Sequence, residues 1–77
     1  MRTYIKEIKY MEQTIQRCEI AYGELFNTVY GYLDDGKAII VGHYWHEENV
    51  DAKEEDFVGL TVAEAKELLS QKRQPKV

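Results

Sequence analysis

The chain has 77 residues, a net charge of −4 and a single cysteine. Its length fits one domain over residues 1–77, and its apolar content of 44% is high enough for a folded core. One cysteine excludes a disulfide-stapled mini-protein and a zinc site built on paired cysteines. The longest apolar run, residues 38–41, is far below the ~20 residues of a membrane span, and no signal-peptide core is seen. We therefore expect a cytoplasmic protein without a membrane partner.

The first element that the pattern predicts is an amphipathic helix over residues 3–22. Apolar side chains recur there at steps of four and three, which is the spacing of one helical face. These positions are Tyr4, Ile8, Met11, Ile15, Cys18, Tyr22 and Leu25. An alternative makes 14–22 a strand, with Thr14, Gln16, Cys18, Ile20 and Tyr22 on one face. The strand would bury two polar side chains, Thr14 and Gln16, which favours the helix. The sequence alone leaves both alternatives open.

A β-hairpin follows, with strands at 26–33 and 38–45 around an Asp-Gly turn. Both segments are rich in β-branched and aromatic residues, and Asp35-Gly36 is a strong type I′ signal. This turn would set Leu33 opposite Ala38. One face would then carry Val29, Gly31, Leu33, Ala38, Ile40, Gly42 and Tyr44, and the other Thr28, Tyr30, Tyr32, Ile39, Val41, His43 and Trp45.

The last part of the chain predicts an acidic connector and a short helix. The connector spans residues 47–58, and a capping box at Thr61 and Glu64 begins a helix over 61–72. Residues 73–77 are expected to fray after it. Residues 56–69, with their Val-Gly-Leu-Thr entry into a helix, resemble the opening of a PASTA repeat. That likeness covers 14 of 77 residues, and we carry over no function from it. The fold class is thus α+β: an N-terminal amphipathic helix, a central antiparallel hairpin or small meander, and a short C-terminal helix.

The residues that carry catalytic chemistry are few. His43 and His46 lie three apart on a strand, so their rings would point to opposite faces, and we expect no metal site. Cys18 lies among apolar positions without a neighbouring base, which favours a structural, buried thiol. No carboxylate pair has an apolar setting that would separate two pKa values. We expect no cofactor and no enzymatic activity.

Two surfaces remain as candidate binding sites. The first is the aromatic face of the hairpin, with two nearby cations, and it comprises Tyr30, Tyr32, His43, Trp45, Arg17 and Lys37. The second is an acidic partner surface on the connector, made of Glu47, Glu48, Asp51, Glu54, Glu55 and Asp56. Exposed aromatics favour protein interfaces and stack on bases. The aromatic face could equally be core, covered by a helix.

We interpret the chain as a small binding module that acts by occupying a protein partner. Small acidic chains often serve as inhibitors, including phage-encoded blockers of a host system. The alternative is a small oligomer that sequesters a nucleotide-like ligand, with the aromatics on the base and Arg17 or Lys37 at the phosphate. Two apolar sheet faces need two covers, so we also expect a homodimer or higher oligomer. Basic residues cluster only in the tail, which argues against duplex nucleic acid.

Overall fold

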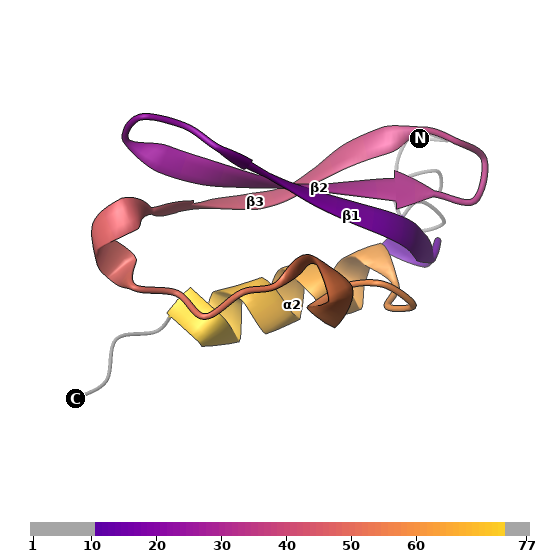
Figure 1. The fold of residues 1–77 in the computed structure, drawn as a ribbon. Coiled ribbons are helices and arrows are strands. Elements are labelled where there is room, and N and C mark those ends of the chain that lie inside the picture. The colour runs from indigo at the N-terminus through magenta and orange to yellow at the C-terminus, as the bar shows by residue number, and fades with distance from the viewer. Residues whose placement is uncertain (1–10, 74–77) are drawn as a thin grey trace, which may run out of the picture.

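The computed structural model describes residues 11–73, and these form an α+β fold. Three strands, β1 (Ile15–Tyr22), β2 (Phe26–Leu33) and β3 (Ala38–Trp45), make an antiparallel meander in the order β1-β2-β3. Two 3₁₀ turns, η1 (His46–Glu48) and η2 (Glu54–Asp56), lead to the helix α2 (Val62–Arg73). The helix lies against one face of the sheet (Figure 1). Within residues 11–73, no helix has both the length and the apolar character to cross a membrane.

The prediction of a helix over residues 3–22 is wrong for residues 15–22, which form β1. Residues 1–10 lie outside the described part of the chain. A β-bulge between Ile15 and Arg17 explains the misleading pattern. It inserts an extra residue, so that Ile15 and Cys18 share the buried face although they are three positions apart. A three-residue step in a bulged strand thus imitated the spacing of a helix.

The predicted hairpin is confirmed, but its register near the turn is not. Tyr32, and not Leu33, lies opposite Ala38. The Leu33 amide donates to the Lys37 carbonyl at 2.8 Å, which leaves a three-residue loop in which Gly36 adopts a φ of 88°. This left-handed conformation suits glycine and fits a type I turn followed by a bulge.

A second irregularity, at Val41, restores the expected register in the rest of the hairpin. Tyr30 pairs with Ile40 and Val29 pairs with Gly42, so Val41 is the extra residue of a bulge. Ile39 and Val41 are consequently buried, whereas Ile40 lies on the opposite face of the sheet. These three placements, and that of Ala38 on the face of Tyr32, reverse the predicted faces, because each register shift of one residue exchanges the two sides of a strand.

The core lies between the sheet and the chain that follows β3. Its completely buried large side chains come from β1, β2, the connector and α2, and they are Ile15, Val29, Phe57 and Val62. The close approach of α2 is visible at Gly42, where an added Cβ would lie 2.7 Å from Leu69 Cδ2. Packing against a helix therefore explains this glycine. At Gly31, an added Cβ would instead meet Ile15 of β1.

Backbone hydrogen bonds join the start of α2 to the start of β1. The Ile15 amide donates to the Leu60 carbonyl at 2.8 Å, and the Gly59 amide donates to the Ile15 carbonyl at 2.8 Å. An isolated antiparallel bridge joins Thr14 to Thr61. The predicted capping box is present, with Glu64 N to Thr61 Oγ1 at 3.1 Å and Thr61 N to Glu64 Oε1 at 3.0 Å. The helix predicted over 61–72 is confirmed, and Arg73 is its last residue, not part of a frayed tail. Residues 74–77 lie outside the described part.

Candidate binding surface on the sheet

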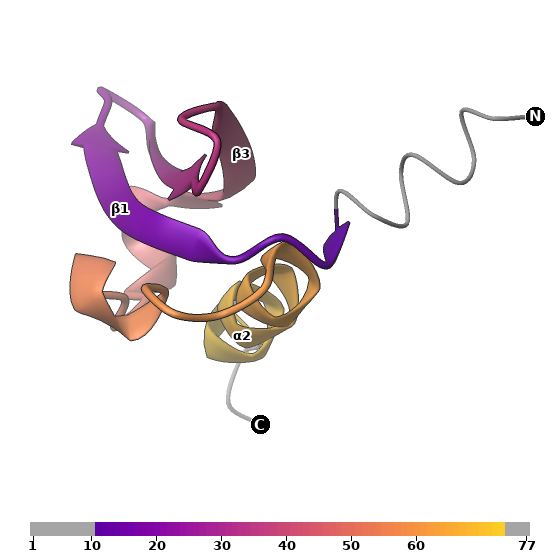
Figure 2. The same ribbon diagram turned by 90° about the vertical axis from the view of Figure 1, so that its right-hand side faces the viewer.

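The predicted aromatic residues lie on the sheet face that points away from α2, called here the outer face. Its cross-strand pairs are Arg17–Tyr32, Glu19–Tyr30, Ala21–Thr28, Tyr30–Ile40, Tyr32–Ala38, Thr28–His43 and Phe26–Trp45. Figure 2, which looks almost along α2, shows the helix and the η2 turn on the same side of the twisted sheet. Among residues 11–73, these elements cover the other face and leave the outer face open.

A cluster of rings occupies one end of the outer face. The Phe26 ring meets His43 edge-on at a centroid distance of 5.3 Å, and Trp45 edge-on at 5.5 Å. The His43 ring is held by a hydrogen bond between Nδ1 and Thr28 Oγ1 at 2.9 Å. Three apolar side chains of the outer face are open to solvent: Phe26 at 40%, Ile40 at 46% and Trp45 at 49% exposure. The cluster is therefore both ordered and accessible.

A polar group occupies the other end of the outer face. The guanidinium of Arg17 lies 4.0 Å from the centre of the Tyr32 ring, a cation–π geometry. The Tyr32 hydroxyl donates to Glu19 Oε1 at 2.9 Å. This hydrogen bond, with lesser contributions from burial and the charge of Glu19, raises the pKa of Tyr32 above its usual value. One cation and one anion thus flank a tyrosine that is fixed in place.

The structure brings together five of the six residues of the predicted aromatic site. Tyr30, Tyr32, His43, Trp45 and Arg17 share the outer face. Lys37 does not join them, since it lies in the β2–β3 turn, where its amide donates to Asp35 Oδ1 at 3.0 Å.

Two large, exposed apolar residues of the outer face were not among the predicted site residues. Phe26 could have been found, because it continues the alternation of Thr28, Tyr30 and Tyr32 along one strand. Ile40 could not, because only the bulge at Val41 turns it outward.

The predicted acidic surface is divided between two roles. Three of its carboxylates are bonded within the chain: Glu48 to Arg73, Glu54 to the Ile20 amide, and Asp56 to the Lys53 amide. Among the described residues, the side chains of Glu47, Asp51 and Glu55 accept no hydrogen bond. Part of this charge therefore stabilises the connector, and these three side chains remain for the predicted partner contact.

The Glu48–Arg73 pair ties η1 to the end of α2. The two hydrogen bonds measure 2.9 and 3.0 Å, and Glu48 Oε2 also accepts from the Trp45 amide at 2.7 Å. The hydrogen bonds from Arg73 lower the pKa of Glu48 most, and the hydrogen bond from the Trp45 amide lowers it further. Bidentate pairing of this kind fixes geometry as well as charge.

Neither the histidines nor the cysteine assembles into a catalytic group in the described chain. His46 Nε2 lies 3.0 Å from Asn27 Oδ1, whereas His43 bonds Thr28, so the two rings serve different contacts. Residues 11–73 contain no cluster of three metal-ligating side chains. Cys18 is buried in β1, and desolvation, followed by the charges of Glu54 and Asp56, raises the pKa of its thiol to about 11. Such a thiol is a poor nucleophile near neutral pH.

No protein-family model, curated protein or solved structure matches the chain.

Proposed function

We propose that this protein is a non-enzymatic binding module that acts, like an inhibitor, by occupying a protein partner through the outer face. The observation that carries the proposal is the ring cluster of Phe26, His43 and Trp45, which is exposed although its members fix one another. Exposed apolar patches on small proteins commonly mark interaction sites. Tryptophan, tyrosine and arginine, all present on this face, are the residues that contribute most to binding at interfaces.

The order of these side chains favours binding. Association costs about 0.5–1.5 kcal/mol for each flexible side chain that becomes immobilised. Here the Thr28 bond holds His43, and Glu19 and Arg17 hold Tyr32, before any partner arrives. A partner would therefore meet a surface whose ordering is largely complete, with apolar rings at one end and a charged pair at the other.

The nucleotide-like ligand remains the alternative proposal. It draws on the accessible rings of Trp45 and Phe26, which could stack on a base. Two placements weigh against it. Arg17 already covers the Tyr32 ring, and Lys37 lies in the turn, away from the ring cluster. A protein partner is favoured because it uses the whole face.

A site-specific cross-link tests the proposal. A photoreactive phenylalanine analogue replaces Ile40 on the outer face or, as the matched control, Val58 on the connector; the two side chains are 46% and 47% exposed. After irradiation in the native host cells, we expect one protein adduct from position 40 that is absent from position 58. The variant Trp45→Ala should remove this adduct while the fold, followed by circular dichroism, persists.

Two results would overturn the proposal. One is the absence of a protein adduct at position 40, and the other is equal labelling at positions 40 and 58. Native mass spectrometry of the isolated protein separates the alternative. A reproducible small-molecule adduct that disappears in Trp45→Ala would assign the outer face to a nucleotide-like ligand.

A further inference from the structure

The two edges of the sheet differ in how far other described segments of the chain cover them. The β1 edge is closed at one end by the bonds between Ile15 and residues 59–60, and further along by Glu54 Oε2, which accepts from the Ile20 amide at 3.0 Å. Within the described part of the chain, no such cover lies along most of the β3 edge. Of its outward amides within residues 11–73, only that of Trp45 has a partner, namely Glu48.

The pairing pattern shows which groups of β3 face outward. In an antiparallel pair, residues alternate between those that bond the neighbouring strand and those that point away from it. The Leu33–Lys37 bond and the outward Trp45 amide fix this alternation at the two ends of β3. The backbone groups of Ala38, Ile40 and His43 therefore point to the open edge.

Nothing along β3 discourages a further strand from pairing with it, apart from the bulge at Val41. Natural edge strands are usually protected by charged residues or proline. The sequence of β3, Ala-Ile-Ile-Val-Gly-His-Tyr-Trp, contains no Lys, Arg, Asp, Glu or Pro. An uncharged edge strand with open backbone groups, here those of Ala38, Ile40 and His43, is the arrangement by which extended peptides add to a sheet.

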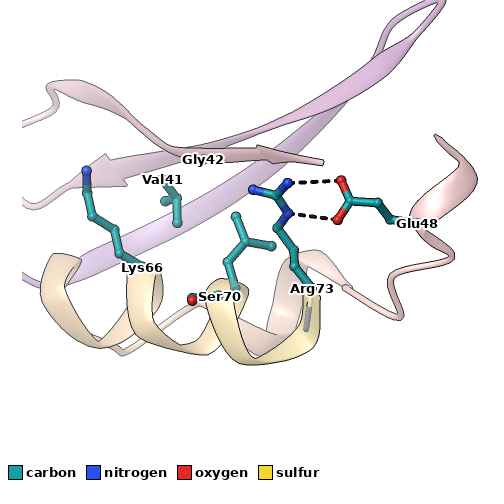
Figure 3. Close-up of a pocket in the computed structure, with 7 residues that line it drawn as sticks. Val41, Gly42, Glu48, Lys66, Ser70 and Arg73 are labelled. Atoms are coloured by element: carbon teal, nitrogen blue, oxygen red, sulfur yellow. Dashed lines mark hydrogen bonds and ion pairs between the residues drawn. The ribbon is translucent and has the colours of Figure 1, made fainter. Parts of the chain in front are cut away.

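A groove runs beside this edge, between β3 and α2 (Figure 3). Its volume is about 350 Å³, many times the ~30 Å³ that a water molecule occupies in the liquid. Val41, Gly42 and Leu69 form its apolar part. Lys66 and Ser70, one helical turn apart, line it from α2, and the Arg73–Glu48 pair closes one end.

The charge of the groove is positive, in contrast to the acidic chain. Glu48 compensates Arg73 through two hydrogen bonds, whereas Lys66 forms no ion pair with any described residue. One cation thus stands beside an apolar floor and a hydroxyl group. This combination suits a carboxylate carried on an extended, partly apolar chain.

We infer that the β3 edge takes up an extended acidic segment of a partner protein as a fourth strand, with a carboxylate side chain in the groove beside Lys66 and Ser70. Alternate residues of an added strand point to opposite faces, so one set enters the groove and the other extends the outer face. The inference rests on the proposed function, since it names the kind of partner that such a binding module would hold.

A second copy of the chain fits this edge less well. Two-fold pairing of β3 with β3 would place both α2 helices on the same side of one sheet, with identical groove walls facing each other. Each groove, with the uncompensated charge of Lys66, would then face a groove of the same charge, and β3 itself offers no carboxylate to either. Like charges brought together in this way oppose association. The homodimer predicted from the sequence therefore becomes an outcome of the test.

The probe is a library of random 12-residue peptides displayed on phage and selected on the intact protein. We expect the enriched sequences to share an Asp or Glu within an extended apolar pattern. Adding a synthetic copy of a selected peptide should shift the NMR resonances of the backbone amides of Ala38, Ile40 and His43. Replacing the peptide carboxylate by its amide should weaken binding about tenfold, the equivalent of roughly 1.4 kcal/mol.

A charge reversal and its control locate the carboxylate. Lys66→Glu should weaken the selected peptide at least about tenfold, whereas Lys53→Glu, the same change at an exposed connector position, should alter affinity less than about twofold. Both lysines are exposed, so neither change threatens the fold. An affinity for the peptide that is unchanged in Lys66→Glu would overturn the inference. Enriched sequences without Asp or Glu, or a library that yields no binding peptide, would also overturn it.

Native mass spectrometry tests the second copy. A dimer that dissociates in Ile40→Pro, which removes an outward amide, would assign the edge to self-association and overturn the inference. The two proposals fail separately. A cross-link from position 40 that persists in Lys66→Glu, with no peptide selected, would support partner binding at the outer face and overturn peptide binding at the β3 edge. Peptides that bind as expected, with no protein cross-linked from position 40 in cells, would support binding at the β3 edge and overturn the proposal for the outer face.

Discussion

Gly23 lies where the β1–β2 turn leaves no room for a side chain. Its amide donates to the Phe26 carbonyl at 3.1 Å, and an added Cβ would lie 2.6 Å from the same oxygen. Backbone cannot move aside as a flexible side chain can, so we expect Gly23→Ala to lower the free energy of unfolding by about 1–3 kcal/mol. Urea denaturation measures this. Glu24→Ala, at the exposed neighbouring position, is the control and should change stability by less than about 0.5 kcal/mol. Equal effects of the two substitutions would contradict the steric explanation.

Cys18 should make the protein sensitive to alkaline pH. Its thiol pKa is raised from 9.0 to about 11 by burial, so the folded state holds its proton where the unfolded state has lost it. The free energy of unfolding is therefore not reduced by this group below pH 9, and it falls by up to about 3 kcal/mol as the pH rises from 9 toward 11. Denaturation at several pH values measures the slope. Cys18→Ala should flatten it, and an unchanged slope in that variant would assign the loss to other groups.

At the scale of elements, the edge of β1 depends on one carboxylate. Glu54 accepts the Ile20 amide, whereas its neighbour Glu55, which is also exposed, accepts no hydrogen bond among the described residues. Glu54→Ala should therefore destabilise the fold by about 1 kcal/mol and speed hydrogen exchange of the Ile20 amide. Glu55→Ala should do neither. The same exchange rate in both variants would show that water replaces the carboxylate without cost.

The elements also show what the sequence could and could not predict. The Thr61–Glu64 capping box and the two hairpin strands are local signals, and both are confirmed. β1 was predicted only as the alternative to a helix, a strand over 14–22, because its bulge spaces Ile15 and Cys18 like residues of a helix. Bulges depend on pairing with another strand, so no local pattern reveals them. Four aromatic residues of the outer face were predicted despite the shifted turn register, because the second bulge cancels that shift before His43 and Trp45.

At the scale of the whole molecule, Phe57 joins the connector to the core. It is completely buried and is the largest such side chain, whereas its neighbour Val58 is 47% exposed. Phe57→Ala should cost about 3–5 kcal/mol through lost burial and a residual cavity. A domain of this length is stable by only about 4–12 kcal/mol. We therefore expect a thermal midpoint lowered by well over ~10 °C, against a small change in Val58→Ala. Similar midpoints for the two variants would show that the core closes without the connector.

The bonds between residues 13–15 and 59–62 also bear on how the chain folds. They close a loop of about 45 residues, whereas the two hairpins form from neighbouring segments. Closure of this loop should follow the hairpins, after the transition state. A substitution there, such as Thr61→Ala, should then leave the folding rate nearly unchanged and accelerate unfolding about fivefold for each 1 kcal/mol lost, as stopped-flow kinetics would show. The lifetime of the folded molecule would thus be set where the start of β1 meets the start of α2, and its rate of formation by the three strands of the sheet.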